Sequence, residues 1–343
     1  MITLKPEEKR IILKNHTGGY REYRIPGILA VNGALLLACE ARAEEMGDWG
    51  DIDVLILRME PAGDPVEVLK IGESHLPPDG TMRTYNNPVL IPDGECVHLI
   101  YHINYERAFV VSSPDGGSTW GESREITDAY REFPYEWNCC ATGPGHGICM
   151  KNGRLVAPIW LAMGEALPDG TRRHWPSVCG CVYSDDHGET WHAGGLAEGM
   201  DSGNETNVVE LPDGRLLFNH RSRNKVRRRM LSLSDDGGET FHTTWCAEDL
   251  TDPQCFGGME IVGGTVLFAN CDSETKRVDL TVRTSDDAGT AWRALWRVDP
   301  MGGYVDAAVL DGRLWLFYER TNYEKDCIIE DIVLTSAVIE VHA

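Results

Sequence analysis

The sequence lacks any long hydrophobic run and has little positive charge. Its first ten residues carry five charged side chains where a signal peptide needs an apolar stretch, and no later segment approaches transmembrane length. We therefore expect a cytoplasmic protein with no membrane partner. The 32 Lys and Arg residues face 54 Asp and Glu residues, which gives a net charge of -22. Because like charges repel, we expect no nucleic-acid partner, and a site for a small anion must be locally basic.

The sequence also lacks the cysteine spacing of a structural metal site. Its 11 cysteines are scattered, and the closest sets, Cys139-Cys140 and Cys179-Gly180-Cys181, do not form paired C-x-x-C motifs. Elsewhere, no His, Cys and carboxylate residues have the spacing of metal ligands. The sequence therefore predicts reduced, mostly buried thiols, no metal and no organic cofactor.

Strong helical periodicity is absent as well, whereas one short turn motif recurs along the whole chain. It is a pair of residues that ends in Gly and precedes an apolar run, and it returns roughly every 50 to 60 residues. The six copies are Asn32-Gly33, Asp93-Gly94, Asn152-Gly153, Asp213-Gly214, Gly263-Gly264 and Asp311-Gly312. Asn-Gly and Asp-Gly supply the positive φ angles of tight hairpins, so each copy predicts two antiparallel strands.

A second repeated motif, S-x-D-x-G-x-T-W, is the pattern known as the Asp box. It occurs at 113–120, 184–191 and 234–241, with a weaker copy at 285–292. Its Asp can accept hydrogen bonds from the amides of a tight turn while its aromatic residue packs between sheets, which is a structural role. Together the two motifs predict an all-β fold, a single six-bladed β-propeller domain over residues 1–343 with four-stranded antiparallel blades. A two-domain β-sandwich would not repeat the same turn six times.

The repeats predict which polar residues share one end of the blades. Three of them precede a turn glycine by eight or nine residues, and three follow one by seven to nine residues. Because antiparallel pairing returns the second strand to the start of the first, all six are expected at one face. The first set is Arg24, Glu205 and Tyr304, and the second is Arg42, Arg221 and Glu319.

Two further candidates, Asp48 and Arg277, lie just beyond the returning strands and are expected to overhang the same face. Asp51 is an alternative to Asp48 as the acid of its segment. The repeat offsets also place Tyr85 and Asn86 of the second blade on this rim.

His146 lies in the glycine-rich segment 143–147 of the third blade, which the same offsets bring to the rim. A substrate contact and a histidine satisfied by a backbone turn explain its position equally well.

Five features together resemble the sialidase (neuraminidase) family over nearly the whole chain. They are the Asp boxes, Tyr23-Arg24-Ile25-Pro26, Asn204-Glu205, Arg277-Val278-Asp279-Leu280 and Tyr318-Glu319. The resemblance implies a retaining exo-α-sialidase that hydrolyses a sialylated oligosaccharide or another acidic-sugar glycoside. Three arginines, Arg24, Arg221 and Arg277, would then clamp the sugar carboxylate.

The remaining candidates also take roles from this resemblance. Glu319 would hold Arg24, and Arg42 would add a substrate contact. Tyr304 would be the nucleophile, Glu205 its base and Asp48 the acid/base.

The implied chemistry agrees with these residue types. Arginine forks match a carboxylate in two hydrogen bonds, and a neutral phenol avoids repulsion between the nucleophile and the substrate's own carboxylate. We expect Glu205 to accept the phenol proton and the arginines to favour the phenolate.

Other functions stay open. They are a hydrolase of another ulosonic acid, a transferase, a non-catalytic propeller that binds acidic glycans, and a propeller hydrolase of neutral sugars. Departures from the common motif at Phe241, Ala291 and Asp279 leave the sugar's identity open.

Overall fold

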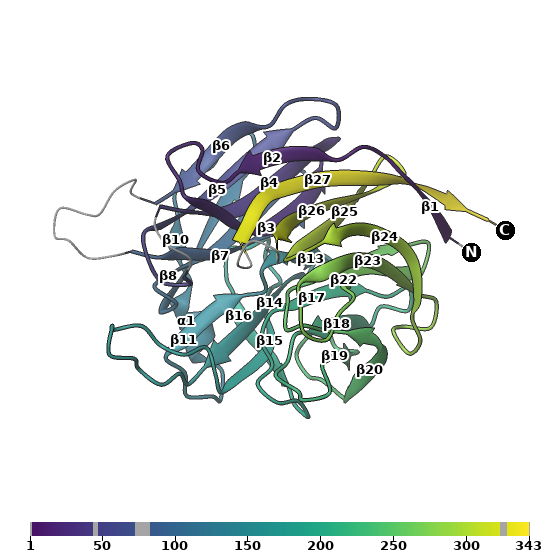
Figure 1. Cartoon of the computed structure of the whole chain (residues 1–343). Helices are drawn as coiled ribbons and strands as arrows, with labels where there is room; N and C mark the ends of the chain where they lie inside the picture. The colour runs from purple at the N-terminus through teal and green to yellow at the C-terminus, as the bar shows by residue number, and fades with distance from the viewer. Residues whose placement is uncertain (1, 44–46, 73–82, 323–327, 343) are drawn as a thin grey trace.

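Strands make up nearly all of the regular structure. The computed structural model describes residues 2–43, 47–72, 83–322 and 328–342. Within them, six β-sheets follow one another around a ring (Figure 1). The one helix in these ranges, α1 (Thr127–Arg131), has five residues. This arrangement confirms the predicted six-bladed β-propeller.

The first three sheets run outward from the ring axis in chain order. The first contains β3 (Glu22–Val31), β4 (Ala34–Arg42), β5 (Ile52–Met59) and β6 (Val66–Ile71). The second contains β7 (Tyr85–Asp93), β8 (Cys96–Ile103), β9 (Arg107–Ser113) and β10 (Arg124–Glu125). The third contains β11 (Cys139–Thr142), β14 (Leu155–Ala162), β15 (Ser177–Ser184) and β16 (His192–Ala197), and β13 (Ile148–Cys149) also pairs with β14.

The last three sheets complete the ring. The fourth contains β17 (Thr206–Glu210), β18 (Leu216–His220), β19 (Arg228–Ser234) and β20 (Thr243–Thr251). The fifth contains β21 (Gly258–Val262), β22 (Thr265–Cys271), β23 (Val278–Ser285) and β24 (Arg293–Met301). The sixth contains β25 (Val305–Leu310), β26 (Arg313–Asn322), β27 (Ile328–Val341) and β1 (Ile2–Pro6), and β2 (Arg10–Lys14) also pairs with β27.

The sixth sheet joins the two ends of the described chain. β1 pairs antiparallel with β27, with Ile2 opposite Val341 and Pro6 opposite Ala337. These two strands lie side by side at the right of Figure 1. Closing the ring with strands from both ends leaves the inner strands of all six sheets facing a common axis.

Every predicted turn glycine joins the two innermost strands of one sheet. Gly33 lies between β3 and β4, for example, and Gly312 between β25 and β26, both with positive φ. In the third sheet the equivalent turn, at Gly153, joins β13 to β14. The turn motif therefore located every blade.

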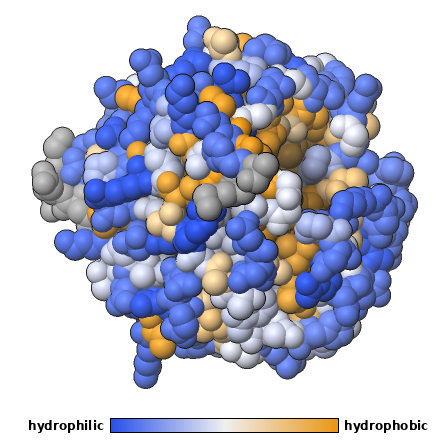
Figure 2. Space-filling view, turned by 90° about the vertical axis from the view of Figure 1, so that its right-hand side faces the viewer, coloured by the Kyte–Doolittle hydropathy of each residue, from blue (hydrophilic) through white to orange (hydrophobic). Residues whose placement is uncertain are grey.

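Hydrophobic side chains fill the boundaries between neighbouring blades. Leu36 of the first sheet and Leu90 of the second belong to one buried cluster, and comparable clusters fill the other five boundaries. The face in Figure 2 is mostly hydrophilic, with exposed hydrophobic residues gathered mainly in a hollow. No helix in the described ranges is long and apolar enough to span a membrane. Each described cysteine is a free thiol, as predicted, while Cys327 lies outside those ranges.

The Asp boxes close the turns between the third and fourth strands of four sheets. In the second box, Asp186 accepts a hydrogen bond from the Thr190 amide at 2.8 Å, and Trp191 donates its indole N–H to Gly188 at 3.2 Å. The weaker fourth box keeps both contacts, from Ala291 to Asp287 and from Trp292 to Gly289. These bonds confirm the structural role of the motif.

Candidate active site

A cavity of about 210 Å³ opens where the innermost strands begin, at one mouth of the ring. Six of the predicted site residues line it. They are Arg24, Asp48, Glu205, Arg221, Arg277 and Tyr304. The first sheet contributes Arg24 on β3, while Glu205, Arg277 and Tyr304 directly precede β17, β23 and β25. Side chains more than 250 residues apart in the sequence therefore meet at one place because the repeat returns each blade to the same mouth.

Glu319 fixes Arg24 from below the cavity. Its Oε1 accepts a hydrogen bond from Arg24 Nε at 2.9 Å, and its Oε2 accepts one from Nη2 at 3.3 Å. The same carboxylate accepts the backbone amides of Ile25 and Tyr304, each at 3.0 Å. Glu319 has no exposed side-chain surface and does not line the cavity. Although burial opposes it, the Glu319 carboxylate raises the pKa of Arg24 well above its ordinary value, so Arg24 stays a cation.

Tyr304, Glu205 and Arg221 form one hydrogen-bonded group. The Tyr304 hydroxyl donates to Glu205 Oε1 in a short contact. Arg221 Nη1 donates to Glu205 Oε2 at 2.6 Å and to the Tyr304 hydroxyl oxygen at 2.8 Å. Glu205 is therefore placed to accept the phenol proton, while Arg221 can stabilise negative charge on either oxygen.

Two more arginines surround the Tyr304 ring. The Cζ atom of Arg277 lies 4.9 Å from the ring centroid, and that of Arg24 lies 5.3 Å away. With Arg221, three guanidinium groups from three blades face one small cavity in a strongly acidic protein. The cavity is therefore locally basic, which is the property expected of a site for a small anion in so acidic a chain.

Tyr304 keeps its proton in the unliganded protein, although the nearby arginines favour the phenolate as expected. Burial, followed by the neighbouring Glu205 carboxylate, raises the pKa of Tyr304 above its ordinary value. The three arginines lower it but offset only part of this effect. The unliganded site therefore holds a neutral phenol, and the arginines alone do not produce a phenolate.

Asp48 lies at the exposed edge of the cavity, and 53% of its side chain is exposed. Partial desolvation would raise the pKa of its carboxyl, but Arg42 and then His174 outweigh that effect and lower the pKa to about 2. Asp48 is therefore ionised in the unliganded protein. The alternative acid, Asp51, does not line the cavity.

Arg42 lies beneath the cavity wall and does not line it. Its guanidinium donates to Glu40 at 2.6 and 3.0 Å and to the Gly47 carbonyl at 2.6 Å, and its side chain is 2% exposed. Nη2 also reaches Asp48 at 3.4 Å. Arg42 lies at the end of the blade that its repeat offset predicted. Its guanidinium, however, is bonded to the buried Glu40 and does not reach the cavity, so the structure gives no support for the predicted substrate contact.

Tyr85 and Asn86 are buried, and neither lines the cavity; their neighbour Asn87 does. The strand register shifts between Asn86 and Val89, and Asn87 has a φ of 51°. The first blade has the same irregularity at Ile25, whose φ is 58°. A bulge changes which face of the sheet each side chain occupies. The residue of this blade that reaches the cavity is therefore Asn87, one position after the predicted Asn86.

His146 is also absent from the cavity wall. The short strand β12 (Gly145–His146) leaves its own sheet and pairs in parallel with β7. His146 Nδ1 lies 3.0 Å from both carboxylate oxygens of Asp306 on the ring axis. The rim prediction was wrong because the third blade divides its inner strand into three short pieces.

Aromatic and polar side chains that the repeat did not predict complete the cavity. His174 packs against Tyr105 and Trp160, with ring centroids 4.5 and 4.9 Å apart, and its Nδ1 lies 3.8 Å from Asp48. Trp175 and Arg223 lie at the mouth. Except for Trp160 on β14, these residues lie in loops that join the second and third strands of a blade, and such loops vary in length, so a fixed offset from the turn glycine does not place them. The clustering of Trp and His at 174–175 was the one available signal.

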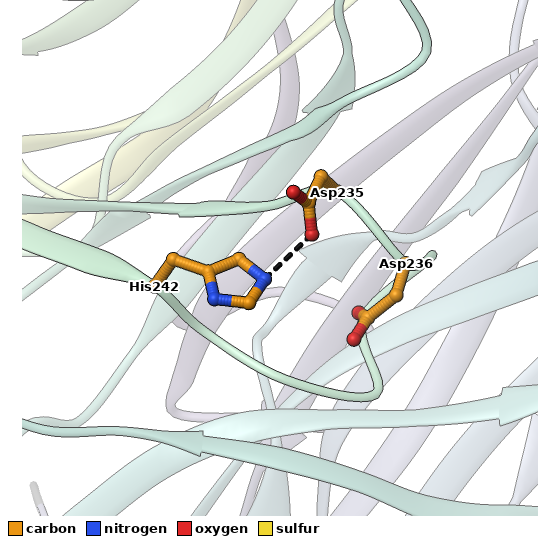
Figure 3. A group of neighbouring side chains, drawn as sticks. All are labelled: Asp235, Asp236 and His242. Atoms are coloured by element: carbon orange, nitrogen blue, oxygen red, sulfur yellow. Dashed lines mark hydrogen bonds and ion pairs between the residues drawn. The ribbon is translucent and has the colours of Figure 1, made fainter.

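One group of potential metal ligands occurs within the described ranges, on the third Asp box (Figure 3). His242 Nε2 lies 2.5 Å from Asp235. Asp236, however, already accepts hydrogen bonds from the amide and hydroxyl of Thr240. Its carboxylate is committed to the turn, and the group does not line the cavity, so it gives no support for a catalytic metal.

Comparison with known families agrees with this architecture. The model of the BNR repeat-like domain family matches residues 33–304. The chain belongs to this family. Its relatives include sialidases, which confirms the resemblance that the motifs carried.

The similarity to individual sialidases is moderate. The sialidase of Micromonospora viridifaciens is 28% identical over 346 aligned positions, which cover 89% of this chain and 51% of that protein. Sialidase-4 of Mus musculus is 33% identical over 160 residues, 45% of this chain and 32% of that protein. The matched part of the chain thus spans about half, or less, of the length of these relatives. The solved Hadza microbial sialidase Hz136 has a TM-score of 0.78 at 23% identity, covering 96% of this chain and 68% of that one, which shows a shared fold.

Proposed function

We propose that this protein is a retaining exo-α-sialidase, a glycoside hydrolase that removes a terminal sialic acid or a related nonulosonic acid. The observation that carries the proposal is the bonded group of Tyr304, Glu205 and Arg221 inside a cavity with two further arginines. A propeller that merely binds acidic glycans needs the arginines but has no use for a phenol bonded to a buried carboxylate. The sialidase names of its relatives support the same activity.

Substrate binding uses the arginine group. The sugar carboxylate lies next to the anomeric carbon, so anchoring it on Arg24, Arg221 and Arg277 brings that carbon over the Tyr304 hydroxyl. Glu319 keeps Arg24 oriented before substrate arrives. Because this orientation is already set, little side-chain entropy is lost on binding.

In the first step the Tyr304 oxygen attacks the anomeric carbon while its proton passes to Glu205. The bond from that carbon to the leaving oxygen breaks, and Asp48 delivers a proton to this oxygen. Asp48 is ionised in the free protein, so it must gain this proton as substrate binds. Arrival of the substrate carboxylate offsets part of the positive field and excludes water, and both effects raise the pKa of Asp48.

In the second step Asp48, now a carboxylate, removes a proton from water. The water oxygen attacks the anomeric carbon, the bond to Tyr304 breaks, and Glu205 returns the proton to the phenol oxygen. Two displacements at one carbon retain its configuration.

The test is hydrolysis of a fluorogenic α-ketoside of N-acetylneuraminic acid by the wild type and by Tyr304→Phe. We expect activity in the wild type and a loss of at least about 10³-fold in the variant, because the nucleophilic oxygen is removed. Tyr130→Phe is the matched control, since Tyr130 is fully buried away from the cavity and its hydroxyl has no partner among the described residues. A folded wild type that releases no sugar would refute the sialidase proposal and direct the search to other ulosonic acids and then to glycan binding alone.

A further inference from the structure

An exposed tryptophan and an arginine stack on each other at the mouth of the cavity. The Cζ atom of Arg223 lies 4.1 Å from the centroid of the Trp175 ring, and both residues line the cavity. Trp175 precedes β15 of the third blade, whereas Arg223 follows β18 of the fourth. The pair therefore bridges two blades, and neither blade contains it alone.

Both side chains are unusual for their location. Trp175 is 36% exposed and is the one aromatic residue among the exposed large hydrophobic side chains that the structure describes. Arg223 is exposed and forms no ion pair with any described residue. By contrast, Arg24 and Arg221 in the same cavity are each paired with a glutamate. In a chain of net charge -22, packing and ion pairing do not explain an uncompensated cation on an exposed aromatic ring, so a contact with a ligand is the better explanation.

The neighbouring Arg173 does not share this property. Its Cζ atom also approaches the Trp175 ring, at 5.4 Å, but its Nε lies 3.1 Å from Glu165. Its charge is therefore partly compensated. Arg223 remains the cation whose donors are available to a ligand, and stacking on the ring restrains the orientation of its guanidinium plane.

The pair lies on the side of the cavity where a leaving group would depart. With the substrate carboxylate on Arg24, Arg221 and Arg277, the bond to be broken lies toward Asp48 at the exposed edge. Asp48 is 3.8 Å from His174, and Trp175 is the next residue in the chain. A group released past Asp48 would therefore meet Trp175 and Arg223.

We propose that Trp175 and Arg223 form a subsite for an anionic leaving sugar, and this inference rests on the proposed sialidase function. The exposed indole face offers a surface to the C–H side of a sugar ring. The guanidinium fork then binds a carboxylate or sulfate on that sugar through charge-assisted hydrogen bonds. The preferred substrates are glycosides in which an acidic sugar is linked to a second anionic sugar.

The experiment compares kcat and KM for four substrates. They are the fluorogenic ketoside, α2,3-sialyllactose with its neutral leaving sugar, the α2,8-linked dimer of N-acetylneuraminic acid, and sialyllactose sulfated on galactose. Wild type is compared with Arg223→Gln and with the control Lys225→Gln. Lys225 is an exposed cation two residues after Arg223 but does not line the cavity.

We expect Arg223→Gln to raise KM for at least one of the two anionic-leaving substrates by about tenfold, with KM for α2,3-sialyllactose changing less than about twofold. The dimer and the sulfated sugar distinguish a carboxylate from a sulfate as the bound group. The Lys225→Gln control should match wild type. If all KM values change equally, or if none changes while the fluorogenic ketoside is still cleaved, the subsite is refuted and the proposed sialidase function stands. If wild type cleaves none of the four, the proposed function fails and the subsite with it.

Discussion

Glu319 holds Arg24 through two hydrogen bonds and, with the same two oxygens, binds the amides of Ile25 and Tyr304. One buried carboxylate thereby links the first blade to the sixth, directly beneath the cavity. It sets the position of a predicted carboxylate-binding arginine and of the predicted nucleophile's backbone at once.

Replacing Glu319 with Gln should therefore weaken both stability and substrate binding. The change removes the counter-charge that is hydrogen-bonded to the buried Arg24 cation, and we expect a loss on the order of 3 kcal/mol in unfolding free energy. If the variant folds, KM should rise more than kcat falls, because binding of the sugar carboxylate is what suffers. Denaturant unfolding and steady-state kinetics measure the two effects.

The control for this prediction is Glu22→Gln, since Glu22 is buried on the same strand as Arg24 but has no hydrogen bond to it among the described contacts. Equal losses of unfolding free energy in the two variants would show that the Glu319–Arg24 ion pair adds no stability beyond that of any buried glutamate on these strands.

Glu205→Gln should lower kcat by about 10²–10⁴-fold while the protein stays folded. The amide can still accept a hydrogen bond from Tyr304 but cannot take up its proton, and that transfer is the base's contribution. Initial rates with the fluorogenic ketoside measure the effect. Glu210→Gln is a suitable comparison because Glu210 ends β17, the strand that Glu205 directly precedes, and so lies at the opposite mouth. Near-normal turnover in Glu205→Gln would assign the base elsewhere.

Asp48→Asn should affect substrates according to their leaving groups. A natural sugar alcohol needs protonation as it leaves, so sialyllactose cleavage should fall by about 10²–10⁴-fold. A fluorogenic phenol leaves more easily without help, so the first step on that substrate should suffer less. Single-turnover kinetics separate this step from hydrolysis of the intermediate. Asp51→Asn should behave like wild type, and the reverse pattern would identify Asp51 as the acid.

His146 and the two carboxylates beside it, Asp306 and Glu260, should make the stability of the protein depend on pH. Burial opposes protonation, but Asp306 and Glu260 outweigh it and raise the pKa of His146 from 6.5 to about 9. Burial raises the pKa of Glu260 from 4.5 to about 7, although His146 opposes the shift. Both groups bind protons more tightly in the folded state. Through His146, stability should therefore fall as pH rises between about 6.5 and 9. Below pH 7 the fall due to Glu260 is opposed by the buried His102 and His220, because burial lowers the pKa of each from 6.5 to about 3.

Thermal unfolding from pH 5 to 9.5 measures this slope. The His146 contribution is on the order of 3 kcal/mol, and His146→Gln should flatten the slope between about pH 7 and 8. At higher pH the buried thiols, such as Cys179 and Cys181, add a fall of their own because burial raises the pKa of each to about 12. His187→Gln, at an exposed histidine, should leave the slope intact. A wild-type unfolding temperature that stays constant or rises between pH 7 and 9 would contradict the predicted direction.

The sequence by itself determined the number of blades and the mouth at which the site lies. Each turn glycine is needed locally because its φ is positive, and each blade boundary is filled by apolar side chains of the strands. The glycine turns and the apolar strands therefore both recur along the sequence. Residues at fixed distances from those glycines, such as Arg24, Glu205 and Tyr304, therefore reach the same face. Their convergence could be predicted without knowing any contact between blades.

Only the tertiary structure decided the details that depend on neighbouring blades. Arg42 lies where the repeat predicts, yet its guanidinium is bonded to Glu40 and does not line the cavity. His146 leaves its own sheet to pair with another, and the stack of Trp175 on Arg223 joins loops of two blades. A repeat offset places a residue along its own hairpin, but burial, bulges and contacts across blade boundaries determine which side chains reach the cavity and with what charge.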